Sequence, residues 1–160
     1  MNWSIRELVI EDVPALLEWY NNEELHNTAN AKEFKSYTLK QLNEYWKGKL
    51  ARPNAKYFTI IVDEQVVGRV GLKQQKNKDI FEYSILIGVQ KLYSKGLGTE
   101  VTKYFVEKVF LDPNISSVYL EVRADNRRAI RCYEKVGFQI SKTFEENKVT
   151  MYGMDIKRIG

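Results

Sequence analysis

The sequence predicts an α/β fold: a mixed, twisted sheet of about seven strands with helices on both faces. Short β-branched and aromatic runs alternate with longer segments whose apolar residues recur at helical spacing. Two of the runs, Phe81–Gly88 and Ser117–Val122, flank one helical segment, which predicts a βαβ unit with parallel neighbouring strands. A polar turn at Asp63–Gln65 between the runs Tyr57–Val62 and Val66–Leu72 predicts an antiparallel hairpin.

Length and composition indicate one globular domain spanning residues 1–160. Apolar residues make up 44% and charged residues 29%, which is typical of a folded chain. No stretch approaches the ~20 apolar residues that cross a membrane, and the N-terminus lacks the layout of a signal peptide. The single cysteine, Cys132, excludes an internal disulfide and favours the reducing cytoplasm. A net charge of +4 suits an anionic ligand but is too small to predict nucleic-acid binding.

The first third of the chain predicts one strand and two helices. The strand is Ile5–Val9, and the first helix begins near Pro14, because proline and the acidic residues before it suit a first turn. The second helix begins at Thr38, a suitable N-cap with Gln41 three residues later. Residues 21–36 between them are polar and mixed, and no regular structure is expected there. The buried stripe expected on the first helix is Val13, Leu16, Leu17 and Tyr20, and the second helix carries the apolar residues Leu39, Leu42, Tyr45, Trp46 and Leu50.

The second half predicts two more helices and the last strands. Thr99–Phe110 is helical, with a buried stripe of apolar residues. Another helix runs from Asp125 or Asn126 to about Val136 and ends at Gly137, since glycine is favoured just after a helix. Two strands close the chain, Phe138–Phe144 and Val149–Ile156. The residues expected in the stripe of the first of these helices are Val101, Tyr104, Phe105 and Val109.

The loop Tyr93–Gly98 lies between the strand Phe81–Gly88 and the helix that follows. Its glycines let the backbone approach a ligand closely, and the N-terminus of the helix presents free N–H groups to an anion. Lys95 adds a positive charge. The loop is therefore a candidate phosphate site. Two glycines are a weak motif, and an ordinary strand-to-helix turn is the alternative.

The segment Asn126–Phe138 carries a stronger signal. On a helix, its small, apolar and amide side chains share one face with Tyr133, which leaves room for a thin ligand. Basic residues form a separate stripe. An amphipathic helix with a solvated basic face and a core tyrosine is the alternative. The first face is formed by Asn126, Ala129, Ile130 and Tyr133, and the basic stripe by Arg127, Arg128, Arg131 and Lys135.

These two stretches resemble the GCN5-related N-acetyltransferase (GNAT) superfamily, which transfers acetyl from acetyl-coenzyme A to an amine. The helix motif Asn-x-x-Ala-Ile-x-x-Tyr-Glu-Lys-x-Gly-Phe is matched at every fixed position of Asn126–Phe138. Ile87–Gly88 and the aromatic Tyr93 are similar to the branch of ribosomal-protein N-acetyltransferases, and aminoglycoside 6′-N-acetyltransferases share similar features. Tyr93 is a departure, since it stands where the general loop pattern has Arg or Gln.

The resemblance implies a GNAT fold whose two parallel central strands part at a bulge, with acetyl-CoA as co-substrate and no metal. Backbone groups at the end of the first strand would hold pantetheine, and Asn126 would bind the pantetheine amide. Lys91, Lys95, Arg127 or Arg128 would replace the missing phosphate contact at Tyr93. The cofactor-binding residues predicted in this way are Ile87, Gly88, Val89, Tyr93, Ser94, Lys95, Gly96, Leu97, Gly98, Thr99, Asn126, Arg128 and Ala129.

Three residues are the catalytic candidates. The resemblance implies that Tyr133 protonates the departing thiolate. Attack also needs a neutral amine, so a base or a water chain must remove a proton. Glu121 is the expected base, with Glu82 as its rival. Cys132 is expected to be an inert buried thiol, and His26 a loop residue.

The expected function is acetyl-CoA-dependent acetylation of a primary amine by direct attack. The acceptor is a small cationic amine, such as an aminoglycoside or polyamine, or a protein N-terminus. The alternative is a non-catalytic acyl-CoA-binding sensor or subunit. The protein is expected to act in the cytoplasm as a monomer or homodimer, with neither nucleic acid nor a membrane as partner. Residues 18–50 and the last two strands are expected to select the acceptor, although no motif there identifies it.

Overall fold

The computed structural model describes residues 2–159 and contains one seven-stranded sheet and five α-helices within them. The strands are β1 (Trp3–Glu7), β2 (Ala55–Val62), β3 (Gln65–Gln74), β4 (Ile80–Ile87), β5 (Ser117–Arg123), β6 (Gln139–Glu146) and β7 (Val149–Lys157). The helices are α1 (Val13–Tyr20), α2 (Glu23–Ala29), α3 (Leu39–Leu50), α4 (Leu97–Val109) and α5 (Arg127–Val136), with short 3₁₀ turns at Ile10–Asp12 and Gln90–Leu92.

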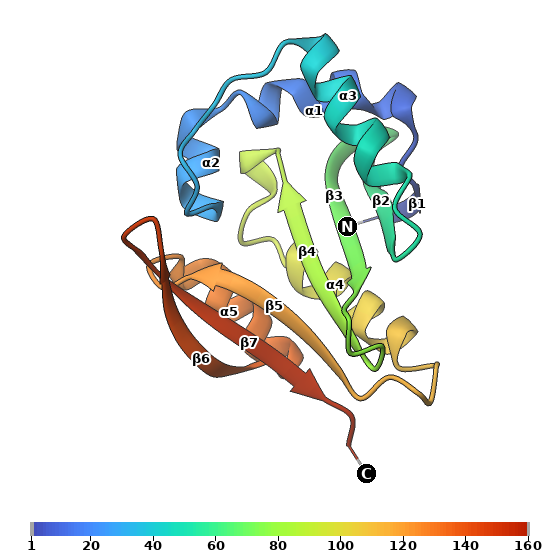
Figure 1. Ribbon diagram of the computed structural model, residues 1–160. Coiled ribbons are helices and arrows are strands. Elements are labelled where there is room, and N and C mark those ends of the chain that lie inside the picture. The colour runs from blue at the N-terminus through green and yellow to red at the C-terminus, as the bar shows by residue number, and fades with distance from the viewer. Residues whose placement is uncertain (1, 160) are drawn as a thin grey trace.

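The sheet has the strand order β1-β2-β3-β4-β5-β7-β6, and only β4 and β5 are parallel (Figure 1). This confirms the predicted mixed α/β fold and its central βαβ unit. The predicted hairpin is also confirmed, because β2 and β3 are joined by a turn in which Asp63 and Glu64 both have positive φ angles of 50° and 66°. Two positive φ angles suit the twist of a tight hairpin.

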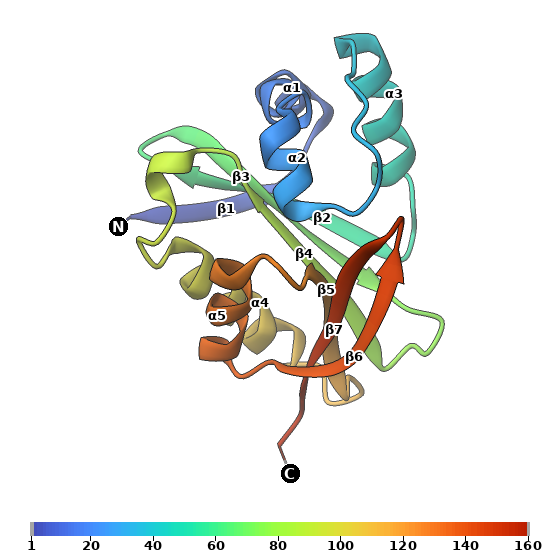
Figure 2. The same cartoon turned by 90° about the vertical axis from the view of Figure 1, so that its left-hand side faces the viewer.

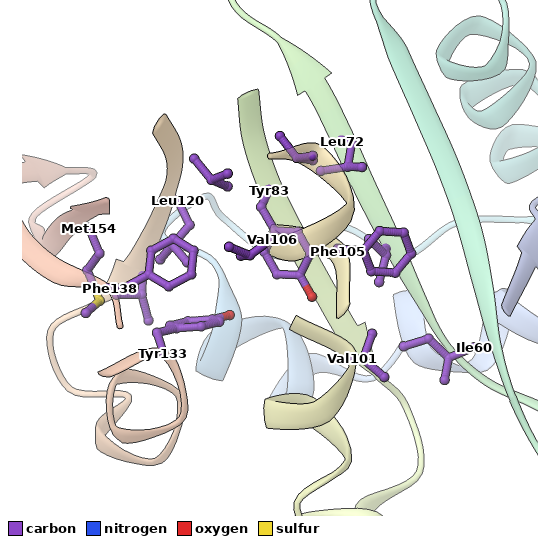
Figure 3. Packing of buried hydrophobic residues seen from close by; sticks show 14 of the residues in the cluster. Ile60, Leu72, Tyr83, Val101, Phe105, Val106, Leu120, Tyr133, Phe138 and Met154 are labelled. Atoms are coloured by element: carbon purple, nitrogen blue, oxygen red, sulfur yellow. The ribbon is translucent and has the colours of Figure 1, made fainter. Parts of the chain in front are cut away.

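Helices cover both faces of the sheet, and each face has its own apolar core (Figure 2). On one face, α4 and α5 pack on inward-facing side chains of β3, β4, β5 and β7, with Phe105 and Tyr83 near the centre (Figure 3). On the other face, α1 and α3 pack on β2, and Trp46 and Leu16 are fully buried there. The alternation of side chains along each strand separates these two environments.

The two parallel strands part soon after they meet. β4 and β5 are paired only from Ile80 with Ser117 to Glu82 with Tyr119, and they diverge beyond that point (Figure 1). β4 stays in continuous register with β3 up to Ile87. The predicted separation of the strands is therefore present, but the expected bulge does not fall within this paired part of β4. The register shifts of the sheet lie between β2 and β3 and between β6 and β7 instead.

Several element predictions need correction. Residues 21–36 are not wholly irregular, because Glu23–Ala29 form α2, capped by the side chain of Asn22, which accepts a hydrogen bond from Leu25 N at 3.0 Å. His26 therefore lies on a helix rather than in a loop. The first strand is Trp3–Glu7 instead of Ile5–Val9. α2 escaped prediction because no residue of this short helix is buried, so its sequence has no apolar stripe.

Other details of the helices agree better. Thr38 and Gln41 form the predicted capping box of α3. Gly137 ends α5 at φ 121°. α4 begins at Leu97, two residues before its predicted start, and Tyr104 is exposed although it was expected in the buried stripe. Val106 is buried instead, because the buried face of α4 is centred between the rows Val101–Phe105–Val109 and Thr102–Val106, and Tyr104 lies outside it.

Candidate active site

The N-terminus of α4 offers uncapped backbone donors. Gly96 is its N-cap in the left-handed region, at φ 85°, and supplies no side-chain cap. The first amides of a helix lack partners within it, and the helix dipole gives them partial positive charge. A Cβ added at Gly98 would lie 3.5 Å from Cys132 Sγ and 3.7 Å from Ile87 Cδ1, so Gly98 faces the space between β4 and α5. The residues of the predicted phosphate loop thus form a helix N-terminus whose free backbone amides can bind an anion.

Tyr93 ties this loop to the end of β4. Its hydroxyl donates a hydrogen bond to the carbonyl oxygen of Ile87 at 3.0 Å. The guanidinium of Arg128 lies 3.9 Å from the centre of the Tyr93 ring, which is a close cation–π contact. Tyr93 therefore holds together two groups of the predicted site, the end of β4 and the start of α5, and it positions the guanidinium that is expected to meet phosphate.

The start of α5 is unusual in its charge. Arg127 and Arg128 occupy its first turn, which contains no acidic residue, although a helix N-terminus favours negative charge. The Asn126 side chain caps the helix by accepting from Ala129 N at 3.3 Å, and its amide donates to the Thr28 carbonyl at 3.4 Å. Uncompensated positive charge at this helix end suits an external anion.

A cavity of about 570 Å³ is lined by Tyr93 and by the start of α5. It lies between α2, the end of β4 and the start of α5, and it is open to solvent. Four of the residues predicted to bind the cofactor line it: Gly88, Tyr93, Asn126 and Arg128. Its other wall comes from α2, through residues such as Thr28, which no sequence motif indicated. Gly88 has no room for a side chain, because an added Cβ would overlap the indole ring of Trp19.

Tyr133 lies on the helix-covered face of the sheet. Its ring packs edge-on against Phe138 with centroids 5.9 Å apart, and its oxygen points toward the part of the cluster that contains Tyr83 (Figure 3). The hydroxyl has no hydrogen-bond partner among residues 2–159, yet it is not one of their fully buried unpartnered atoms, so it retains contact with solvent. Burial, with a smaller effect of Cys132, raises the pKa of the phenol. Tyr133 thus keeps its proton until a strong base appears nearby.

The two carboxylate candidates lie on the opposite face. Glu82 is the last residue of β4 paired with β5, and Glu121 follows two residues beyond its partner Tyr119. The Tyr119 hydroxyl donates to Glu121 Oε2 at 2.9 Å. Burial, reinforced by the charge of Glu121, raises the pKa of Glu82. Glu82 is half-buried while Glu121 is exposed, so the structure brings the two carboxylates together in different surroundings.

Cys132 and His26 have local partners only. Thr99 Oγ1 donates to Cys132 Sγ at 3.3 Å, and burial raises the pKa of that thiol. His26 Nε2 lies 2.7 Å from the carbonyl oxygen of Lys32 and the ring packs edge-on against Phe34. Neither side chain reaches the carboxylates of the sheet through a hydrogen bond within the described residues.

Comparison with known proteins identifies the family. The profile of the acetyltransferase (GNAT) domain matches residues 3–139. The chain belongs to the GNAT family. This confirms the predicted N-acetyltransferase family and its fold. Among the residues that the structure describes, no cluster of His, Cys, Asp and Glu is arranged to hold a metal, and no helix has the length and apolar character needed to cross a membrane.

Two relatives match this chain, the first over most of its length and the second over about half of it. The chain is 24% identical over 147 residues to an aminoglycoside N(6′)-acetyltransferase type 1 of Klebsiella pneumoniae, which covers 85% of this chain and 73% of the relative. It is 34% identical over 92 residues to the N-alpha-acetyltransferase RimI of Mycobacterium tuberculosis, which covers 56% of each chain. Both branches named by the sequence resemblance are thus represented among the relatives.

Solved GNAT structures share the fold along nearly the whole chain. An AAC(6′)-Ib structure with ribostamycin and coenzyme A has a TM-score of 0.85 at 22% identity, over 99% of this chain and 94% of the other. A spermidine N-acetyltransferase from Vibrio cholerae with coenzyme A and spermine has a TM-score of 0.83 at 18% identity, over 97% and 95%. Both of these solved structures hold coenzyme A.

Proposed function

We propose that this GNAT protein transfers acetyl from acetyl-CoA to a primary amine by direct attack, with no covalent enzyme intermediate. The uncapped N-terminus of α4 and the arginines of α5 would hold the phosphates, and the cavity between β4 and α5 would hold the pantetheine arm. Bound acetyl-CoA supplies an activated acetyl group. The residues present fit that group, because backbone donors lie at the N-terminus of α4, cations lie at the N-terminus of α5, and the cavity is lined by Gly88, Tyr93 and Asn126.

The separation of β4 and β5 is the observation that carries this proposal. Tyr133 lies on the face covered by α4 and α5, while Glu82 and Glu121 lie on the opposite face. Beyond Glu82 and Tyr119, β4 and β5 are no longer paired, so backbone pairing does not close the sheet between these groups there. An amine that approaches from the carboxylate side and a sulfur that leaves toward Tyr133 would meet where the strands part.

The residues then have complementary tasks. Glu121 or Glu82 would accept a proton from the ammonium form of the acceptor, directly or through water, and leave a neutral nitrogen. The neutral nitrogen would form a bond to the acetyl carbon as the carbon–sulfur bond breaks, and the Tyr133 hydroxyl would give its proton to the departing sulfur. The proton that the new amide nitrogen then loses would restore the phenol through water. Ile87 to Val89, at the end of β4, would orient the thioester through backbone groups.

The proposed acceptors are the same classes of amine that the sequence indicated. The relatives include an aminoglycoside acetyltransferase and an N-alpha-acetyltransferase, and one solved structure holds spermine. Glu82 and Glu121 lie on the face of the sheet opposite α4 and α5, which we call the open face, and their carboxylates suit a cationic amine. We accordingly propose a small amine or a protein N-terminus as acceptor, and a cytoplasmic location, with which the single free cysteine is compatible.

Coenzyme A release from acetyl-CoA in the presence of an amine panel tests this proposal. The panel comprises aminoglycosides, polyamines, amino acids and short peptides with free N-termini, with a reaction lacking amine as the control. We expect amine-dependent thiol release that the double variant Glu82→Gln/Glu121→Gln reduces at least tenfold. Tight acetyl-CoA binding without thiol release for any amine would contradict catalysis and favour the acyl-CoA-binding sensor.

A further inference from the structure

Arg69 is a cation on the open face of the sheet, and the proposed reaction assigns no role to it. It lies on β3 opposite Leu86 of β4. Its Nε donates to the Tyr20 hydroxyl at 2.8 Å, and its Nη1 donates to Ser84 Oγ at 3.3 Å. Arg69 is partly buried while Ser84 is exposed, so the guanidinium meets solvent at the Ser84 end.

Arg69 has no carboxylate partner. The ion pairs among residues 2–159 are Arg6 with Asp12 and Arg123 with Asp125. The second terminal nitrogen of Arg69, Nη2, donates no hydrogen bond within the same residues. A partly buried charge is normally paired, because removing it from water is unfavourable without compensation. The neutral hydroxyls of Tyr20 and Ser84 compensate it only in part.

A second cation lies near Arg69. The ammonium of Lys49 on α3 lies over the rings of Tyr45 and Tyr57, at 5.1 and 5.4 Å from their centres. Burial is the main cause that lowers the pKa of Lys49, and the positive charge of Arg69 acts in the same direction. Arg69 thus disfavours the charged form of Lys49, and two neighbouring like charges are a poor arrangement in an isolated protein.

An unpaired donor completes the cluster. The indole N–H of Trp46 is fully buried and has no acceptor among the described residues. Trp46 lies under both cations, with the Arg69 guanidinium carbon at 5.7 Å and the Lys49 ammonium at 5.9 Å from its ring centre. The cluster is thus rich in N–H donors and aromatic faces and has no anion of its own.

We propose that Arg69, together with Ser84 and Lys49, forms a subsite for an acid group, a carboxylate or a phosphate, carried by the acceptor amine. The proposal rests on the acetyl transfer proposed above. It assigns the acceptor to amines that also bear an acid, such as amino acids, peptides or amino phosphates, in preference to purely cationic polyamines. A guanidinium edge with free N–H groups is the side-chain group best suited to bind either acid.

The position of the subsite agrees with this role. Arg69, Ser84 and Glu82 all project on the face of the sheet away from α4, because Tyr83 between the last two packs on that helix. Ser84 precedes Ile87, the end of β4, by three residues, which is ~10 Å along a strand. An acceptor amine at the strand end would therefore bring a group a few bonds away to Arg69.

The charged side chains of the open face also provide separate binding regions for the acid end and the amine end of an acceptor. Glu82 and Glu121 are on β4 and β5 where these strands part, and Arg69 is on β3 with its head near Ser84. The open face thus has a negative and a positive region side by side. A zwitterionic acceptor matches both regions, whereas a polyamine would place a second ammonium near Arg69 and Lys49.

Matched acceptor pairs test the subsite through kcat/KM measured by coenzyme A release. Lysine is compared with cadaverine and ornithine with putrescine, since each pair differs by one carboxylate. 3-Aminopropyl phosphate compared with 3-aminopropanol tests a phosphate. We expect at least one acid-bearing member to exceed its partner by ~10–100-fold, which is the range of a charge-assisted hydrogen bond. Which pair shows the larger ratio identifies the acid.

The variant Arg69→Met, which retains length without charge, should bring the preferred pair's ratio close to one. Arg69→Lys should restore part of the ratio, because a point charge replaces the fork. Lys47→Met removes an exposed positive charge from α3 and should leave the ratio unchanged. A role of Arg69 in packing alone would lower Tm in Arg69→Met without changing the ratio, and this result would overturn the subsite.

A binding measurement separates failure of the subsite from failure of catalysis. Calorimetry with Nε-acetyl-lysine and with N-acetylcadaverine, in the presence of coenzyme A, needs no turnover. Tighter binding of acetyl-lysine that Arg69→Met abolishes would support the subsite even if thiol release is absent and the proposed reaction fails. Equal turnover and equal binding of the members in every pair would refute the subsite while leaving acetyl transfer intact.

Discussion

The two faces of the sheet differ in how they are built. The face covered by α4 and α5 is a continuous apolar core that includes Phe105 and Tyr133, and its polar groups are gathered at the N-termini of the two helices. The opposite face is covered by α1 and α3 only over β2 and its neighbours. Arg69 lies at the edge of this cover, in contact with Tyr20 of α1, and Glu82 lies further along β4.

The difference indicates separate tasks for the two faces. The apolar face fixes α4 and α5 relative to β4, and so it fixes the groups proposed to hold one unchanging ligand, acetyl-CoA. The open face is assembled from strands and helices far apart in the chain, such as Tyr20 on α1 and Arg69 on β3, which are joined by one hydrogen bond. A change on the apolar face should affect cofactor use and chemistry, and a change on the open face should affect the acceptor.

The largest effect is expected for Tyr133→Phe. The variant retains the ring that packs on Phe138 and removes only the hydroxyl. A general acid contributes ~10²–10⁴-fold, so kcat should fall by that range while affinity for acetyl-CoA stays nearly unchanged. Steady-state kinetics with a confirmed acceptor, together with calorimetry for acetyl-CoA, measure both quantities.

Tyr104→Phe is the matched control for Tyr133→Phe. It removes a phenol hydroxyl from α4 at an exposed position outside the proposed site and should leave kcat unchanged. If Tyr133→Phe has the same kcat as the unsubstituted protein, the phenol has no part in the reaction, and the apolar face contributes only support.

The second effect concerns Gly98. Its missing Cβ would lie in ordinary contact with Cys132 and Ile87, so Gly98→Ala should fold and bind acetyl-CoA with little loss. Gly98→Val extends two further methyl groups into the space between β4 and α5, and acetyl-CoA affinity should fall at least tenfold. Calorimetry measures the affinity, and circular dichroism checks the fold. Unchanged affinity in a folded valine variant would mean that the cofactor does not pass through this space.

The sequence predicted the apolar face better than the open one. Asn126, Tyr133 and the glycines of residues 96–98 lie in short continuous motifs, and such motifs fix a helix start, its cap and its buried side locally. The parallel pair and the hairpin followed from the order of elements, because connection rules leave few alternatives. Boundaries were less accurate, as the early start of α4 illustrates.

The open face could not be predicted because its contacts are long-range. The hydrogen bond from Arg69 to Tyr20 spans 49 residues, and the one from Asn126 to the Thr28 carbonyl spans 98. Neither residue type nor spacing indicates such partners. α2 contributes a wall of the cavity but carries no apolar stripe, so its presence depends on tertiary context. Tyr119 was passed over for a different reason, because its link to Glu121 is local but depends on alternation within β5, which places both side chains on one face.

The third effect is a shift in pH dependence that tells the two carboxylates apart. The pKa of Glu82 is raised first by burial and then by the charge of Glu121. If Glu82 is the base, Glu121→Gln removes a like charge and lowers that pKa, so the acidic limb of kcat/KM moves to lower pH, by about one unit or less. If Glu121 is the base, the same variant abolishes the limb.

Glu82→Gln completes the test of the pH dependence. It should abolish the limb in the first case and leave it present in the second. The profiles of the two variants and of the unsubstituted protein are measured with one acceptor at saturating acetyl-CoA. Three coincident profiles would assign proton removal to water and restrict the open face to binding.

The smallest effect is expected for salt. Arg127, Arg128, Lys91 and Lys95 are exposed, so their attraction to phosphate is screened as ionic strength rises. Affinity for coenzyme A should fall between 50 and 500 mM salt by a few-fold, an order-of-magnitude expectation for exposed pairs. Dephospho-coenzyme A, which lacks the 3′-phosphate, should show a shallower slope. Arg128→Met should reduce the slope for coenzyme A and also release the Tyr93 ring, while Lys47→Met on α3 should change neither slope. Equal slopes for the two cofactors would mean that these cations do not read the 3′-phosphate, and cofactor binding on this side would then depend on the backbone donors of α4.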